Sequence, residues 1–158
     1  MSIQWALMGA LAANRYRASP RLTNDIDLLL ADTGPGIEEL EHALIKEGWS
    51  AHRADSQAEL IRLRHQQHGV ADLLIAGTNY QHQALQHAVE ETIDNEPIKV
   101  LTVEDVIVHK LIAGRYQDLA DIEAILATNF DLDQEYIENW ADFWDVFDRW
   151  EEVQTSLP

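Results

Sequence analysis

The spacing of apolar positions along the chain predicts a mixture of strands and helices. Short alternating or continuous apolar stretches predict strands, and apolar positions three or four residues apart predict helices. The predicted strands are residues 3–11, running into Gly9-Ala10, and residues 21–31, 49–54, 60–65, 70–76 and 98–101. The predicted helices are residues 11–16, 37–47, 79–88, 102–113 and 116–127, and one long terminal helix that includes residues 136–150.

Turn and cap residues separate these elements. Gly48 follows the helix over residues 37–47 as its C′ residue. His68-Gly69 predicts a hairpin turn between two strands. Thr102 is the expected N-cap of a helix that Gly114 interrupts. At these boundaries, the conformational preference of the residue explains why the element ends or begins.

The terminal helix carries an apolar stripe that is rich in aromatic residues. Its members at helical spacing are Tyr136, Ile137, Trp140, Phe143, Trp144, Phe147 and Trp150. Such a stripe packs into a core or, where it stays exposed, binds a partner. The general burial of aromatic residues favours the core.

Two acids lie two residues apart in the second predicted strand. Alternation on a strand would place the carboxylates of Asp25 and Asp27 on one face, while Ile26 and Leu28 turn to the other. Like charges held this close repel, and a divalent cation between them would relieve the repulsion. Alternatively, the strand begins at Leu28 and both acids lie in a solvated turn. The residues by themselves leave both interpretations open.

A third acid, Asp72, interrupts the otherwise apolar strand over residues 70–76. An isolated buried carboxylate is costly unless it is paired or bound to a metal. Asp72 is therefore the third candidate metal ligand or base.

A single glycine, Gly9, separates the first predicted strand from the first predicted helix. A glycine there lets backbone N–H groups approach an anion at the helix N-terminus. Arg15, Arg17 and Arg21 follow within a few residues and could form a local cationic site. The alternatives are a glycine that simply ends a strand and arginines that are solvated.

Composition limits the function classes. The 158 residues suit a single domain with a real core, and the net charge of −17 disfavours binding to duplex nucleic acid. The chain has no cysteine and shows no signal-peptide pattern or long apolar run, so we expect a cytoplasmic protein that does not enter membranes.

Two separated motifs resemble the AbiEii-type toxin nucleotidyltransferase group of the DNA polymerase β-like nucleotidyltransferase superfamily. The first is Gly9-Ala10 followed by Arg21-Leu22-Thr23-Asn24-Asp25-Ile26-Asp27, and the second runs from Lys110 through Ala113 and Arg115 to Asp118 and Asp121. The likeness covers about residues 5–127. It implies an α+β fold with a nucleotidyltransferase-like mixed β-sheet, flanking helices and a helical C-terminal segment. The core would span residues 1–101, and C-terminal helices over residues 102–158 would pack on it as one compact domain.

The resemblance also implies an activity, the Mg²⁺-dependent transfer of a nucleoside monophosphate from an NTP to a hydroxyl acceptor. Asp25, Asp27 and Asp72 would be catalytic and would bind the metal. The nucleotide-binding residues would be Gly9, Ala10, Arg21, Thr23, Lys110 and Arg115. The acceptor could be a small molecule, a protein or RNA. An antitoxin protein would be the partner in a toxin–antitoxin or phage-defence system.

Ala10 departs from the family pattern, which has Gly or Ser at the second turn position. A hydroxyl that could bind phosphate is therefore missing. The alternative function is a catalytically degenerate relative that binds a nucleotide or a protein. For Lys110 and Arg115, the alternative is ion pairing with Glu104, Asp118 or Asp121.

Overall fold

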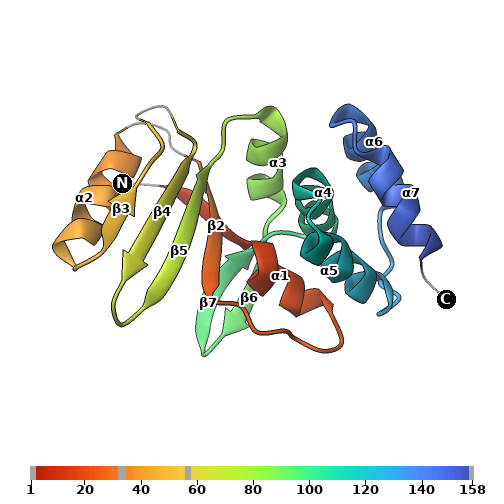
Figure 1. The fold of residues 1–158 in the computed structure, drawn as a ribbon, viewed down its shortest axis with the longest axis horizontal. Coiled ribbons are helices and arrows are strands. Elements are labelled where there is room, and N and C mark those ends of the chain that lie inside the picture. Colours follow the sequence, from red (N-terminus) through yellow and green to blue (C-terminus); the bar gives the residue numbers. More distant parts are fainter. Residues whose placement is uncertain (1–2, 32–34, 56–57, 157–158) are drawn as a thin grey trace. The chain divides into compact units, whose positions relative to one another are not determined.

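The computed structural model of the protein describes residues 3–31, 35–55 and 58–156. The chain divides into two compact units. The first unit comprises residues 1–8 and 23–101, and the second comprises residues 9–22 and 102–158. Figure 1 shows the strands of the first unit and the helices of the second.

The first unit is built on a mixed sheet that has seven strands in the described residues. The strands are β1 (Gln4–Met8), β2 (Asp25–Ala31), β3 (Ser50–His52), β4 (Leu60–His65), β5 (Gly69–Ile75), β6 (Val89–Ile93) and β7 (Glu96–Val100). Their order in the sheet is β3-β4-β5-β2-β1-β7-β6. Strand β2 pairs antiparallel with β1 and parallel with β5, which confirms the predicted α+β class with a mixed sheet.

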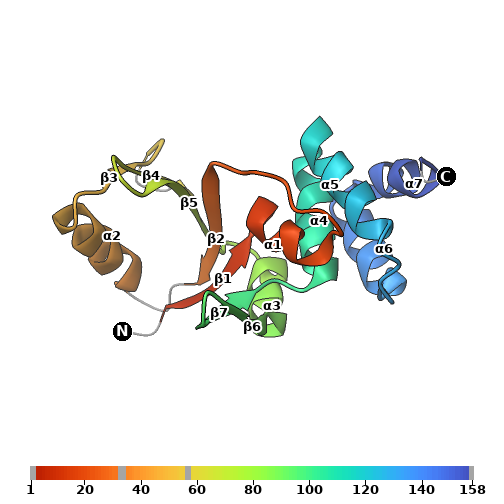
Figure 2. The same ribbon diagram turned by 90° about the horizontal axis from the view of Figure 1, so that it is seen from below.

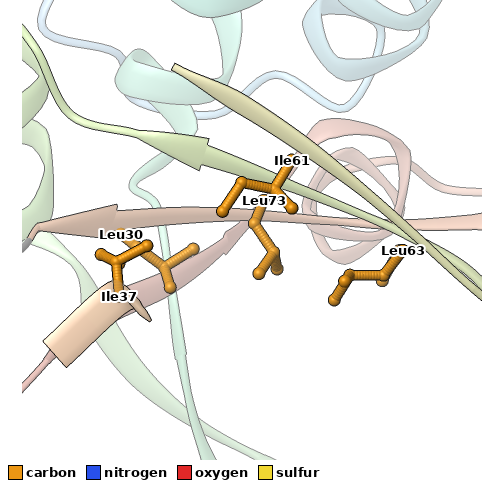
Figure 3. Close-up of a cluster of buried hydrophobic side chains, with 6 residues drawn as sticks. Leu30, Ile37, Ile61, Leu63 and Leu73 are labelled. Atoms are coloured by element: carbon orange, nitrogen blue, oxygen red, sulfur yellow. The ribbon is translucent and has the colours of Figure 1, made fainter. Parts of the chain in front are cut away.

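One face of this sheet carries the apolar core of the first unit. Helix α2 (Gly36–Lys46) lies on one side of β3, β4 and β5 (Figure 2). The buried cluster consists of Leu30, Ile37, Ile61, Leu63, Ala71 and Leu73, drawn as sticks in Figure 3. In β4, Ile61 and Leu63 alternate with Arg62 and Arg64, and in β5, Ala71 and Leu73 lie on either side of Asp72, so these charged side chains project from the opposite face.

Helix α3 (Asn79–His87) completes the first unit and packs against β2 and β1. Thr78 caps its N-terminus by accepting a hydrogen bond from the backbone N–H of Gln81 at 3.2 Å, and the Gln81 side chain accepts one from the Thr78 N–H at 3.1 Å. This reciprocal capping box satisfies two backbone donors that helix geometry leaves unpaired.

The second unit is helical. Its helices are α1 (Gly9–Tyr16), α4 (Val103–Ala113), α5 (Tyr116–Leu126), α6 (Gln134–Phe143) and α7 (Phe147–Thr155). Thr102 caps α4, as predicted, by accepting from the N–H of Asp105 at 3.2 Å. Gly114 ends α4 with φ of 61°, a left-handed conformation that glycine adopts without steric cost.

The prediction of one long terminal helix is wrong. Helices α6 and α7 are separated near Asp145, whose φ is 56°, and the N–H of Val146 bonds back to the carbonyl of Ala141 at 2.8 Å. The break lets Trp150 become fully buried, whereas Phe143 stays 68% exposed. The aromatic stripe is therefore only partly core.

Strand β6 was not among the predicted strands. Its residues are mainly exposed and include two adjacent glutamates, so it lacks the apolar alternation that marks a strand. A hairpin joins it to β7 through Asp94 and Asn95, both with positive φ. That pair of turn residues was the available signal.

Within the described residues, every helix is too short or too polar to cross a bilayer.

Candidate functional site

Strand β2 begins at Asp25, so both predicted acids lie within the strand rather than in a turn before it. Asp25 and Asp27 consequently share one face of the sheet. Asp72 in β5 is the direct register partner of Asp27 in the parallel β2–β5 pair. Because neighbouring strands are about 4.8 Å apart and register partners point to the same face, all three acids share this face. We call Asp25, Asp27 and Asp72 the acidic face.

An arginine that the sequence-based prediction missed pairs with this face. Arg62 in β4 is the antiparallel register partner of Asp72. Its Nε donates to Asp72 Oδ1 at 2.8 Å, and its Nη2 donates to Oδ2. The guanidinium thus engages both carboxylate oxygens, the geometry that makes arginine–carboxylate pairs specific. On the neighbouring strand β3, the register partner of Arg62 is His52.

The charges of the acidic face act together on Arg62. The hydrogen bonds and charge of Asp72, followed by the charges of Asp25 and Asp27, raise the pKa of Arg62 above its ordinary value. The Arg62 side chain is 43% exposed and that of Asp72 is 13% exposed, so solvent reaches the pair from the arginine side. The acidic face is therefore a partly exposed, negatively charged surface, and Arg62 is the cation that pairs with Asp72 on it.

The donor set of the acidic face suits a hard divalent cation, because carboxylate oxygens are the ligands that Mg²⁺ prefers. Among the described residues, however, no three His, Cys, Asp or Glu side chains are already placed around a common metal position. Asp72 is turned into its bidentate pair with Arg62, which occupies both of its oxygens. The three carboxylates are chemically suitable ligands for Mg²⁺. In this structure, the positive charge beside Asp72 is the guanidinium of Arg62.

The predicted junction of strand, glycine and helix is confirmed. Strand β1 ends at Met8 and helix α1 begins at Gly9, whose φ of 63° favours glycine. Ala10 is buried within α1. In the first unit, Thr23 Oγ1 donates a long hydrogen bond of 3.4 Å to the carbonyl of Asp25.

The cationic residues of the second motif form a buried ion network in the second unit. Lys110 Nζ donates to Asp121 Oδ2 at 2.7 Å and to Asp118 Oδ1 at 3.3 Å. Arg21 donates two hydrogen bonds of 2.8 Å to Asp121, and Arg17 donates one of 2.6 Å. Arg115 Nε donates to Asp118 at 2.6 Å. We call these six residues the buried ion network.

The network keeps its two aspartates charged although they are buried. Burial alone would raise the pKa of Asp121, but the hydrogen bonds from Arg21 and Lys110 and the charges of both residues lower it to about 2. The pKa of Asp118 is also lowered, because Arg115 and Lys110 outweigh its desolvation. The ion-pairing alternative for Lys110 and Arg115 is thus what the structure contains. The partners are Asp118 and Asp121, while Glu104 accepts from the N–H of Asp133 instead.

A large apolar cavity lies on the other face of the sheet, away from the acids. Its volume is about 510 Å³, and Leu40 and Leu44 of α2 and Ile26 and Leu28 of β2 are among its lining residues. Ile26 and Leu28 alternate with Asp25 and Asp27, so the cavity and the acidic face are on opposite sides of β2. The cavity therefore has no part in the carboxylate chemistry.

Comparison with known proteins assigns the chain to a family. The family described as "Nucleotidyl transferase AbiEii toxin, Type IV TA system" matches residues 2–154. No curated protein sequence matches the chain. The family match spans both predicted motifs.

Solved structures share the fold. ANT(2")-Ia in complex with adenylyl-2"-tobramycin has a TM-score of 0.62 at 15% identity, covering 90% of this chain and 87% of that one. The lincosamide antibiotic adenylyltransferase LnuA, lincomycin-bound, has a TM-score of 0.57 at 16% identity, covering 78% and 85%. An antigenic nucleotidyltransferase-like protein from Paracoccidioides brasiliensis has a TM-score of 0.53 at 19% identity, covering 98% and 85%. At these identities, the likeness shows the nucleotidyltransferase fold.

Proposed function

Because the chain belongs to the AbiEii nucleotidyl transferase toxin family, we propose that it transfers a nucleoside monophosphate from an NTP to a hydroxyl acceptor. We further propose that the reaction depends on Mg²⁺ and serves a toxin–antitoxin or phage-defence system. The observation that carries this proposal is the acidic face, in which Asp27 and Asp72 are register partners and Asp25 lies on the same side of β2.

Asp25, Asp27 and Asp72 would hold the metal, which when bound neutralises the triphosphate and activates the attacking hydroxyl. The chain itself supplies the acids on two adjacent strands of a rigid sheet, and this placement limits their reorganisation during the reaction. The network residues Lys110, Arg21 and Arg115, together with Gly9, Ala10 and Thr23, stay predicted nucleotide-binding residues.

Within this proposal, Asp72 accepts the proton of the acceptor hydroxyl. Arg62 orients its carboxylate through two hydrogen bonds, and each carboxylate oxygen keeps a further lone pair for the acceptor hydroxyl. In the proposed reaction, the acceptor oxygen forms a bond to the α-phosphorus, and the bond from that phosphorus to the bridging oxygen breaks. Pyrophosphate leaves, and the hydroxyl proton passes to an Oδ atom of Asp72.

Radiolabel transfer tests the proposal directly. The protein is incubated with Mg²⁺, each of the four α-³²P-labelled NTPs, and total RNA, total protein or a mixture of hydroxylated small molecules. We expect a labelled product with the wild type and about a thousandfold less with Asp27→Asn. Asp94→Asn is the matched control, because Asp94 lies in the β6–β7 turn and asparagine tolerates its positive φ.

The toxin role needs a separate test in cells. Induced expression of the wild type is expected to arrest bacterial growth, and Asp27→Asn at equal protein level is expected not to. Growth arrest by both variants would contradict a toxicity that depends on nucleotidyl transfer. Transfer activity without growth arrest would support the nucleotidyl transfer and contradict the toxin role.

A second candidate function is a non-catalytic relative that binds a nucleotide or a protein. Two observations favour it: Ala10 in place of the family's Gly or Ser, and the bidentate engagement of Asp72 by Arg62. Such a protein would bind an NTP and yield no labelled product with any acceptor. The same transfer experiment therefore separates the two candidates.

A further inference from the structure

Arg62 pairs with a carboxylate of the acidic face that a bound cation would otherwise neutralise. It faces Asp72 directly across the β4–β5 pair and binds both carboxylate oxygens. The charges of Asp25 and Asp27 also act on it. One guanidinium thus interacts electrostatically with all three members of the acidic face.

Arg64 shows that this role is not shared by every arginine on the strand. It lies two residues after Arg62, so it projects from the same face of β4, but its register partner is Val70 rather than an acid. Arg64 is exposed. The two arginines therefore have the same strand, face and charge and differ in whether they pair with the acidic face.

We propose that Arg62 is an internal counter-ion that competes with the divalent cation for the acidic face. The proposal rests on the proposed function, because it concerns the same carboxylates. Without metal, Arg62 neutralises part of the face and holds Asp72 by both oxygens. Cation binding requires Arg62 to release or share Asp72, so the free cation is bound weakly. Arg62 is accordingly a positioning residue that acts through Asp72.

The proposal predicts that removing the positive charge strengthens metal binding. Binding of Mn²⁺ alone is measured from the loss of the EPR signal of free Mn²⁺, and Mg²⁺ is then added to displace it. We expect Arg62→Gln to bind Mn²⁺ about tenfold more tightly than the wild type, because one nearby positive charge is lost. Arg64→Gln is expected to match the wild type within about twofold, and Asp27→Asn to abolish binding in either background.

Thermal unfolding provides a second measurement. In metal-free buffer, Arg62→Gln is expected to melt at a lower temperature than Arg64→Gln, because its carboxylates repel without their counter-ion. Saturating Mg²⁺ is expected to raise the melting temperature more in Arg62→Gln than in the wild type, since tighter binding to the native state stabilises it more. If Arg62→Gln fails to fold, Arg62→Lys replaces it. Lysine keeps the charge but cannot form the bidentate pair, so about threefold tighter binding is expected.

The outcomes separate this inference from the proposed function. A purely structural role for Arg62 predicts equal or weaker Mn²⁺ binding in Arg62→Gln and Arg62→Lys. That result, with binding still abolished by Asp27→Asn, overturns the counter-ion role and leaves the proposed function standing. Mn²⁺ binding that Asp27→Asn does not change overturns the metal site of the proposed function. Failure of all variants to bind Mn²⁺ overturns both.

Discussion

The acidic face and the buried ion network use the same side chain in opposite surroundings. In the network, Asp118 and Asp121 are buried and accept hydrogen bonds from four cationic residues. On the acidic face, three partly exposed carboxylates lie beside one guanidinium that pairs with Asp72. The network is rich in positive charge and the face in negative charge.

The difference shows how the environment decides what an aspartate does. A buried carboxylate without compensation is costly, so the network aspartates must keep their cations for the second unit to stay folded. The carboxylates of the acidic face are partly exposed, so changing a ligand costs them less than it would cost a buried carboxylate, and we expect the face to accept an external cation. Replacing Asp by Asn should therefore affect function in one region and stability in the other.

The largest expected effect is on transfer activity. Asp25→Asn should lower nucleotidyl transfer about thousandfold, equivalent to about 4 kcal/mol of activation free energy, because a metal ligand is lost. Its free energy of unfolding should change by less than about 0.5 kcal/mol, since the site is partly exposed and repulsion is relieved. Transfer assays and urea unfolding measure the two quantities. A large loss of stability would contradict the contrast between the regions.

The next effect is on stability. Asp121→Asn should lower the free energy of unfolding by about 3 kcal/mol, because Lys110 loses a buried charged partner and Arg17 and Arg21 lose theirs. Urea unfolding followed by circular dichroism provides the measurement. Asp142→Asn, at an exposed position of α6 in the same unit, is the control and should stay within about 0.5 kcal/mol of the wild type. An equal response of both variants would contradict a structural role for the network.

Acid should reproduce part of this loss without mutation. The pKa of Asp121 is about 2 in the folded protein and about 3.9 in an unfolded chain. The stabilisation is therefore fully present above about pH 4 and is lost as the pH falls through about 2, with a total of roughly 2 to 3 kcal/mol. Unfolding free energies between pH 5 and 2 should fall less steeply in Asp121→Asn than in the wild type. Parallel curves would show that other groups dominate acid unfolding.

The smallest expected effect is on stability when Arg115, the most exposed member of the buried ion network, is replaced. Arg115 pairs with the buried Asp118, but its own side chain is 79% exposed. Solvent screening weakens such a pair, so Arg115→Gln should cost about 0.5 kcal/mol of stability. Lys110→Met should cost several times more, because it strips a buried cation from two buried carboxylates. Differential scanning calorimetry would rank the two variants, and the reverse order would contradict the importance of burial.

Local sequence signals predicted much of the fold. Thr102 and Gly114 marked the ends of α4, because caps and positive φ values depend on nearby residues. Gly9 marked the junction of β1 and α1, although the helix begins there rather than at the predicted residue 11. The terminal helices were predicted as one, because the segment between them contains no proline or glycine, and the break lies at Asp145, which has a positive φ. Strand β6 was also missed, although the turn residues Asp94 and Asn95 that precede β7 were a local signal for its hairpin.

Strand alternation is a property of the backbone, so the sequence by itself determined that Asp25 and Asp27 would share a face if both lay within the strand. That β2 begins at Asp25 was decided by the structure. The sequence also determined the family, through two motifs whose order and spacing can be read along the chain. Only the tertiary structure decided that Arg62 meets Asp72 and that Arg17 and Arg21 meet Asp121, about a hundred residues away. Strand register and helix packing bring these charges together, and both depend on contacts between residues that are distant in the chain.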